Sequence, residues 1–211
     1  MDLTKKKELF SYDYSDRFAM ENYEYRYLFL DSEVNECVLN DIVYYIIRFN
    51  MEDEGLPVEQ RKPITLFINS PGGFVFDGWC ACDAIKESIT PVYTVNLGLS
   101  ASMAFIIYLA GHKRFTMPHA TFLMHDGSTL GIGSTAKVKD QIEFETGKME
   151  KMTRSFILEQ TKIKPDFYEA KYRVEFYFLP DEAKELGVTQ YIIGKDCTLE
   201  DVLHKRGKED D

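Results

Sequence analysis

INSPGG at residues 68–73 and GLSASM at residues 98–103 each end a β-rich run and begin a helix-like one. The runs that precede them, ITLFIN at residues 64–69 and VYTVNL at residues 92–97, are rich in β-branched residues, which favour strands. The segments that follow them have the apolar content of buried helices. Strands that alternate with helices in this way predict an α/β fold built of βαβ units.

The same alternation continues on both sides of these turns. An amphipathic helix precedes them, and two short strands, a long amphipathic helix and a final helix–strand unit follow them. We therefore expect strands at residues 25–30, 64–69, 92–97, 115–117, 121–124 and 189–193, and helices at residues 34–49, 74–88, 102–110, 134–161 and 181–186.

The long helix expected at residues 134–161 carries one apolar stripe. A stripe of this kind packs either on another subunit or on the helix's own domain, and the spacing alone leaves both possibilities open. Its members recur every three or four residues and include Val138, Ile142, Met149, Met152 and Phe156.

The chain consists of one domain with a flanking segment at each terminus. Residues 1–24 are polar and aromatic without a helical or strand period, so we interpret them as an amino-terminal arm. Residues 25–195 contain all the expected strands and helices and form the domain. Residues 196–211 form a carboxy-terminal tail that ends in the charged sequence HKRGKEDD, which favours disorder.

The charge balance excludes some classes of partner. The chain has 211 residues, with 25 Lys and Arg against 35 Asp and Glu, a net charge of −10 and a pI of about 5.0. A protein this acidic repels nucleic acid and anionic membranes. The longest apolar stretch, residues 101–110, is too short to span a bilayer and indicates a buried helix.

The four cysteines are too sparse for a disulfide framework, and no leader sequence precedes the fold. We therefore expect a cytoplasmic location, with the plastid stroma and the cytoplasm of a phage-infected host also compatible. Cys80 and Cys82 lie two apart on a predicted helix, so they do not face one another and do not indicate a metal site. We expect no metal and no cofactor.

Two serines in the second turn are candidate nucleophiles. A serine hydroxyl attacks a carbonyl only when a base takes its proton and donors stabilise the resulting oxyanion. Ser100 and Ser102 both lie near the start of the helix expected after Gly98, where backbone N–H groups are unpaired and negative charge is favoured. The string differs from the G-x-S-x-G elbow, because Ala104 replaces its second glycine.

Two further features suit the same chemistry. Gly72 and Gly73 lack Cβ atoms, so their backbone can approach a substrate and present an N–H group to a carbonyl oxygen, although PGG is also a common structural turn. His125 ends the run FLM, and strand ends are where side chains reach a cleft. Histidine is a suitable general base at neutral pH, and a merely hydrogen-bonded surface histidine is the alternative.

Taken together, the order of INSPGG, GLSASM, FLMH and a helix with the sequence DEAKELG resembles the ClpP family, the proteolytic subunits of the Clp protease. The resemblance covers residues 25–193. It implies the ClpP/crotonase fold of stacked ββα units with a protruding handle helix. It also implies a serine endopeptidase in seven-membered rings, paired into a tetradecamer and fed with unfolded polypeptides by an AAA+ unfoldase of the ClpX, ClpA or ClpC type.

Position by position, the resemblance assigns the nucleophile to Ser102 rather than Ser100 and the base to His125. It assigns the oxyanion donors to the backbone N–H groups of Gly73 and Met103. The family's substrate groove matches the segment that contains Gly127, Ser128 and Gly131.

The resemblance also implies a catalytic triad of serine, histidine and an acidic residue, and the acidic residue departs from the family. Counted from DEAKELG, the family's aspartate aligns with Glu175, which keeps the carboxylate on a side chain one methylene longer. The arginine that often precedes it in a network between rings is replaced by Val174. These changes favour a second interpretation, a catalytically impaired structural subunit of the ClpR type.

A third interpretation is a crotonase-like acyl-CoA enzyme or a related signal-peptide peptidase. Crotonases use glutamate bases without a serine nucleophile, and the peptidases pair serine with lysine. The combination of Ser102 with His125 favours neither. No phosphate-binding GxxxxGK[ST] motif occurs in the chain, so any use of ATP belongs to a partner.

Overall fold

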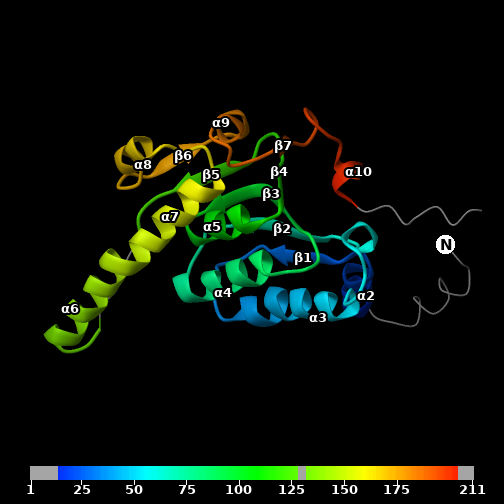
Figure 1. Ribbon diagram of the computed structural model, residues 1–211, viewed down its shortest axis with the longest axis horizontal. Coiled ribbons are helices and arrows are strands. Elements are labelled where there is room, and N and C mark those ends of the chain that lie inside the picture. Colours follow the sequence, from blue (N-terminus) through cyan, green and yellow to red (C-terminus); the bar gives the residue numbers. More distant parts are fainter. Residues whose placement is uncertain (1–13, 128–131, 204–211) are drawn as a thin grey trace, which may run out of the picture.

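The computed structural model describes residues 14–127 and 132–203 (Figure 1). Within these ranges the centre is a seven-stranded sheet in which neighbouring strands run in the order β1-β2-β3-β4-β7, all parallel. The α/β class predicted from the alternating pattern is confirmed. The strands of this row are β1 (Tyr27–Leu30), β2 (Ile64–Ser70), β3 (Val92–Ala101), β4 (Lys113–Thr116) and β7 (Tyr191–Ile192).

Strand β3 is long enough to pair with two different neighbours. Its first half pairs with β4, from Tyr93 opposite Lys113 to Asn96 opposite Thr116. Its second half, Leu99–Ala101, pairs in parallel with β5 (Thr121–Met124). The short strand β6 (Phe176–Phe178) then pairs antiparallel with β5. The candidates Ser102 and His125 therefore directly follow two adjacent strands.

Helices pack on one face of the sheet and form the main core with it. The central one, α5 (Met103–Ala110), is buried along its whole length, as expected from its continuous apolar sequence. Helix α4 (Val75–Lys86) packs against α5, and α3 (Tyr44–Glu52) packs against α4. A π-helical segment, η1 (Leu39–Val43), precedes α3 and also contacts α4. The opposite face carries a smaller apolar cluster that includes Phe67 and Phe115.

The long helix expected at residues 134–161 is present and projects from the body as a handle (Figure 1). It consists of α6 (Thr135–Phe144), a π-helical segment η3 (Glu145–Met149) and α7 (Glu150–Gln160), with helical backbone angles at both junctions. No residue of α6 is buried, whereas Ile157 of α7 belongs to the core. The stripe thus packs on its own domain only at the base of the handle.

Both ends of the domain contain more regular structure than the sequence indicated. The amino-terminal segment forms helix α2 (Tyr14–Tyr25), although its apolar residues show no helical period. In the carboxy-terminal tail, Thr198 caps α10 (Leu199–Val202), and Val202 is buried against the smaller cluster. The charged sequence that begins at His204 lies outside the described residues.

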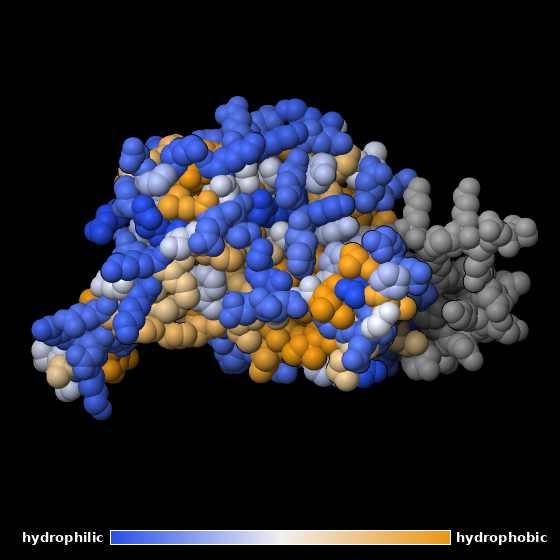
Figure 2. All heavy atoms as spheres, viewed as in Figure 1, coloured by the Kyte–Doolittle hydropathy of each residue, from blue (hydrophilic) through white to orange (hydrophobic). Residues whose placement is uncertain are grey.

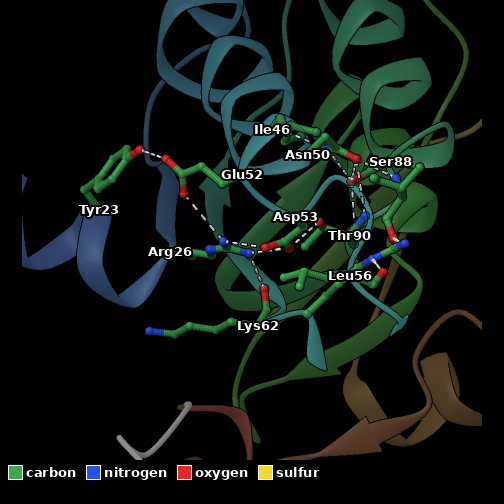
Figure 3. Close-up of polar contacts among 12 residues, drawn as sticks. Tyr23, Arg26, Ile46, Asn50, Glu52, Asp53, Leu56, Lys62, Ser88 and Thr90 are labelled. Atoms are coloured by element: carbon green, nitrogen blue, oxygen red, sulfur yellow. Dashed lines mark hydrogen bonds and ion pairs between the residues drawn. The ribbon is translucent and has the colours of Figure 1, made fainter. Parts of the chain in front are cut away.

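A buried ion pair anchors α2 to the domain (Figure 3). The guanidinium of Arg26 donates to both carboxylate oxygens of Asp53, at 2.6 and 2.8 Å, and to the carbonyl of Lys62 at 2.8 Å. Thr90 donates to the same carboxylate at 2.6 Å. Because these groups come from four separate segments, the network fixes the end of α2 and the end of α3 relative to the sheet.

Of the remaining elements, α9 (Pro180–Glu185) contacts β5 and β7. The segment at residues 163–186 contributes two helices that the sequence analysis placed only in part, since it predicted a helix at residues 181–186 and none before it. The elements are η2 (Val58–Gln60), α8 (Pro165–Lys171) and α9 (Pro180–Glu185).

Candidate active site

Ser102 lies at the sharp turn between β3 and α5. Its backbone angles are φ 52° and ψ −123°, a left-handed conformation that is strained for any residue other than glycine. Its N–H group donates to the carbonyl of Leu123 at 3.0 Å, and its own carbonyl accepts from Phe105 at 3.0 Å. Its hydroxyl makes no capping hydrogen bond to α5. The turn therefore holds this side chain at the helix start without occupying its hydroxyl.

Ser100 is in a different environment. It lies within β3, opposite Ser70 of β2, and is completely buried. Its Oγ has no hydrogen-bond partner among the described residues. Of the two serines that the sequence left as local candidates, only Ser102 lines a cavity.

The Gly72–Gly73 turn packs directly against the Ser102 turn. A Cβ atom on Gly72, which has φ +91°, would lie 2.6 Å from the carbonyl oxygen of Ala101 and 2.7 Å from the Cβ of Ser102. A Cβ atom on Gly73 would lie 2.3 Å from the carbonyl oxygen of Val34. Only glycine permits both approaches, so the PGG turn does more here than connect a strand to a helix.

The two candidate oxyanion donors have unpaired N–H groups. The N–H of Val34 donates to the carbonyl of Gly72 at 2.8 Å, and the carbonyl of Val34 accepts from the N–H of Phe74 at 2.8 Å. In this parallel bridge the N–H of Gly73, which lies between them, takes no part. Met103 is the first residue of α5, where an N–H has no partner within the helix. Neither group donates a hydrogen bond to another described residue. Both are available to a substrate oxygen.

His125 directly follows β5 and is half-buried. It lines the same cavity as Ser102, so pairing of β3 with β5 brings the two candidate catalytic side chains to one site. Within residues 14–127 and 132–203, its imidazole makes no hydrogen bond or ion pair. The ring is thus free to interact with a substrate or with Ser102.

The cavity has a volume of about 740 Å³ and is open at one side. Five of the residues predicted from the sequence line it, and side chains of the handle form one of its walls. In Figure 2, apolar side chains reach the surface where the handle meets the body beside α4. The five predicted residues are Gly73, Ser102, Met103, His125 and Gly127.

Glu175 does not line this cavity. Its side chain is exposed, and one carboxylate oxygen accepts from the Tyr177 hydroxyl at a long 3.5 Å. The structure therefore does not bring the aligned carboxylate to His125. The remaining candidates for the groove, Ser128 and Gly131, lie outside the described residues.

The handle contributes residues that the sequence analysis missed. Gln141, Glu145, Met149 and Thr153 recur every four residues and face the cavity, and Glu150 joins them. Their spacing of four was the available signal, but nothing local indicated which side of the handle faces the serine. Phe74 and Phe76 also line the cavity and are 62% and 69% exposed.

Carboxylates dominate the charge around the cavity wall. Burial is the main cause that raises the pKa of the Tyr172 hydroxyl, and the negative charges of Glu150 and Asp126 also raise it. Arg173 is 3.9 Å from Glu150. The described residues that line the cavity thus carry four carboxylates, those of Glu33, Asp126, Glu145 and Glu150, against one guanidinium.

The chain matches a family model described as Clp protease over residues 10–196. Its similarity to individual proteins extends over most of its length. The ATP-dependent Clp protease proteolytic subunit 3 of Parasynechococcus marenigrum (strain WH8102) is 32% identical over 173 residues, which are 80% of this chain and 82% of that protein. Proteolytic subunit 2 of Corynebacterium glutamicum is 32% identical over 187 residues, 87% of each chain.

A solved structure also matches. A ClpP1 mutant from Listeria monocytogenes superposes with a TM-score of 0.70 at 25% sequence identity, covering 89% of this chain and 99% of that one. The stacked ββα architecture with a projecting handle is therefore the fold of this chain.

Proposed function

Because this chain belongs to the Clp protease family, we propose that it is a serine endopeptidase subunit of a Clp-type compartmentalised protease. Peptidase activity follows from the family, and the serine-type mechanism is our assignment. One observation carries it: the strained Ser102 shares a cavity with His125 and with two unpaired backbone N–H groups.

The proposed reaction begins when Ser102 Oγ attacks the carbonyl carbon of a peptide bond. His125 takes the hydroxyl proton, and the N–H groups of Gly73 and Met103 donate to the oxyanion. His125 then gives the proton to the leaving amine, which produces an acyl-enzyme. A water molecule, deprotonated by the same imidazole, releases the acyl group. Glu175 would orient the imidazole after turning inward from the position that it has in this structure.

Assembly is part of the proposal. The handle carries exposed apolar side chains, including Ile142, Phe144 and Met152, which are 45%, 41% and 42% exposed. A projecting helix gains stability by covering such a stripe with another subunit. We propose heptameric rings, paired into a tetradecamer, that receive unfolded polypeptides from an AAA+ unfoldase of the ClpX, ClpA or ClpC type.

The proposed compartment is cytoplasmic. All four cysteines are free thiols, which is typical of proteins in reducing compartments. Among the described residues, no helix has both the length and the apolar content to cross a bilayer.

A second function is favoured by the position of Glu175. If that carboxylate never reaches His125, the chain fits a structural ring subunit of the ClpR type, which contributes walls and docking surfaces beside active subunits. The two proposals differ in one property, the reactivity of Ser102 in the assembled ring.

The test is covalent labelling of the purified full-length chain with a fluorophosphonate, read by intact mass and by peptide mapping. We expect wild type and Ser100→Ala to gain one adduct per subunit and Ser102→Ala to gain none. Size exclusion measures the assembly of each sample. An intact ring that does not label would overturn the serine endopeptidase proposal and support the structural one.

A further inference from the structure

The cavity next to Ser102 combines an apolar floor with an acidic rim. The floor consists of buried side chains of α5, β5 and α7, among them Phe105, Met124 and Ile157. An unbranched aliphatic stem of a substrate would be favourable there, because it would bury its apolar surface against these side chains. The floor alone does not distinguish between apolar and amphipathic side chains.

The charged groups at the rim of the cavity favour an amphipathic substrate side chain over a purely apolar one. Four carboxylates line the cavity, from Glu33, Asp126, Glu145 and Glu150, against a single guanidinium, that of Arg173. Gln141 holds Glu145 in place by donating to its Oε1 at 2.9 Å. The side chain of Glu150 is only 30% exposed, so its charge is screened less than that of a fully solvated carboxylate. These carboxylates come from the loop after β1, the end of β5 and the handle, and so surround the cavity on several sides.

From this arrangement we infer that the site selects polypeptide segments that place a lysine or arginine beside the cleaved bond. The inference rests on the proposed function, since it names the substrate of the same cavity. A side chain with an aliphatic stem and a cationic end matches an apolar floor and an acidic rim, whereas a glutamate is repelled by the same rim.

The experiment compares three peptides that differ at one position beside the cleavable bond. The position carries lysine, glutamate or norleucine, which has the lysine stem without the ammonium group. Binding to the full-length Ser102→Ala variant is measured by fluorescence anisotropy, and wild-type labelling by the fluorophosphonate is measured in parallel. The binding assay does not require turnover, so it tests selectivity separately from catalysis.

We expect the lysine peptide to bind about threefold to tenfold more tightly than the norleucine peptide, as for one partly screened charge pair. Sodium chloride at about 0.5 M should reduce that preference. In a Glu145→Gln/Glu150→Gln double variant, the ratio of the two affinities should fall towards one. The matched control, Glu143→Gln/Glu159→Gln, removes two exposed carboxylates of the same handle that do not line the cavity, and it should keep the preference.

Equal binding of the lysine and norleucine peptides would overturn the inference, as would a preference that survives the double variant. A lysine preference without fluorophosphonate labelling in wild type would instead reject the proposed catalysis and leave the substrate class standing. Labelling without a lysine preference would reject the proposed substrate class and leave the proposed catalysis standing. The two proposals therefore fail separately.

Discussion

Gly72 and Ser102 are in such close backbone contact that a Cβ atom on the glycine would lie 2.7 Å from the Cβ of the serine. The strand–helix turn at residues 70–74 thus supports the strained turn that presents the candidate nucleophile. Strain of this kind persists only when neighbouring backbone holds it in place.

Gly72→Ala should slow fluorophosphonate labelling of Ser102. The added methyl group would collide with the carbonyl of Ala101 and with Ser102, and a displacement of about 1 Å at a reacting group can cost about 100-fold in rate. Gly55→Ala is the matched control, because Gly55 also has a positive φ, +80°, but nothing lies within 4 Å of the added methyl. Both variants should lose stability, about 1–3 kcal/mol, and only Gly72→Ala should lose labelling rate.

Glu175→Ala should lower the labelling rate of the assembled protein about 1,000-fold or more if this carboxylate orients His125. Glu185→Ala changes an exposed glutamate on α9 and should label like wild type. Tyr177→Phe removes the hydroxyl that contacts Glu175 in the outward position, so it should not slow labelling. Equal rates for Glu175→Ala and wild type would show that this glutamate has no part in the triad.

Asp53→Asn should destabilise the fold in a pH-dependent way. Burial alone would raise the pKa of Asp53, but hydrogen bonds from Arg26 and Thr90 and the charge of Arg26 together lower it. A carboxyl whose folded pKa is below its unfolded value of about 3.9 contributes stability above that value. This contribution is lost as the pH falls through the folded pKa.

The corresponding measurement is urea denaturation of wild type and Asp53→Asn at neutral pH and below about pH 4. We expect a loss of about 3 kcal/mol at neutral pH, which is typical of breaking a buried ion pair, and a smaller difference in acid. Glu52→Gln is the comparison, because Glu52 lies 3.5 Å from Arg26 with its side chain 34% exposed. It should cost about 1 kcal/mol or less. A pH-independent difference for Asp53→Asn would contradict this account.

Arg114→Met should loosen the base of the handle. The buried guanidinium donates to the carbonyls of Leu109 at 3.1 Å, Gln160 at 2.9 Å and Gly187 at 3.1 Å, which lie at or just beyond the ends of α5, α7 and α9. A cation at a helix carboxy-terminus is favourable, and orphaned buried carbonyls cost about 1–3 kcal/mol each.

Limited proteolysis and urea denaturation would measure this effect. We expect earlier cleavage near residue 160 and a lower free energy of unfolding in Arg114→Met. Arg114→Lys keeps the charge but loses the planar guanidinium, so its cleavage rate and its free energy of unfolding should lie between those of wild type and Arg114→Met. Unchanged proteolysis in Arg114→Met would show that other contacts hold the handle.

Much of the fold could be predicted from local patterns. The β-branched runs before INSPGG and GLSASM, the apolar run of α5 and the stripe along the handle each reflect a period that neighbouring residues determine. The helix α2 was missed because its apolar residues lack a clear period, and no residue of it is buried. The helix that contains Val202 was missed because its apolar residues, Leu199, Val202 and Leu203, form too short a run in a charged tail to show a period.

The candidate site also has features that local sequence predicts and features that depend on the fold. Local patterns were sufficient to predict the α/β order, the glycine turn, the serine turn and a histidine at a strand end, because backbone conformation and period depend on adjacent residues. The folded structure was needed to show that Ser102 lines the cavity while Ser100 is buried in β3, that Glu175 is exposed outside the cavity, and that carboxylates of the handle line it. These relations join residues far apart in the chain, and their distances are set by the register of β3 with β5 and by the packing of the handle on α5.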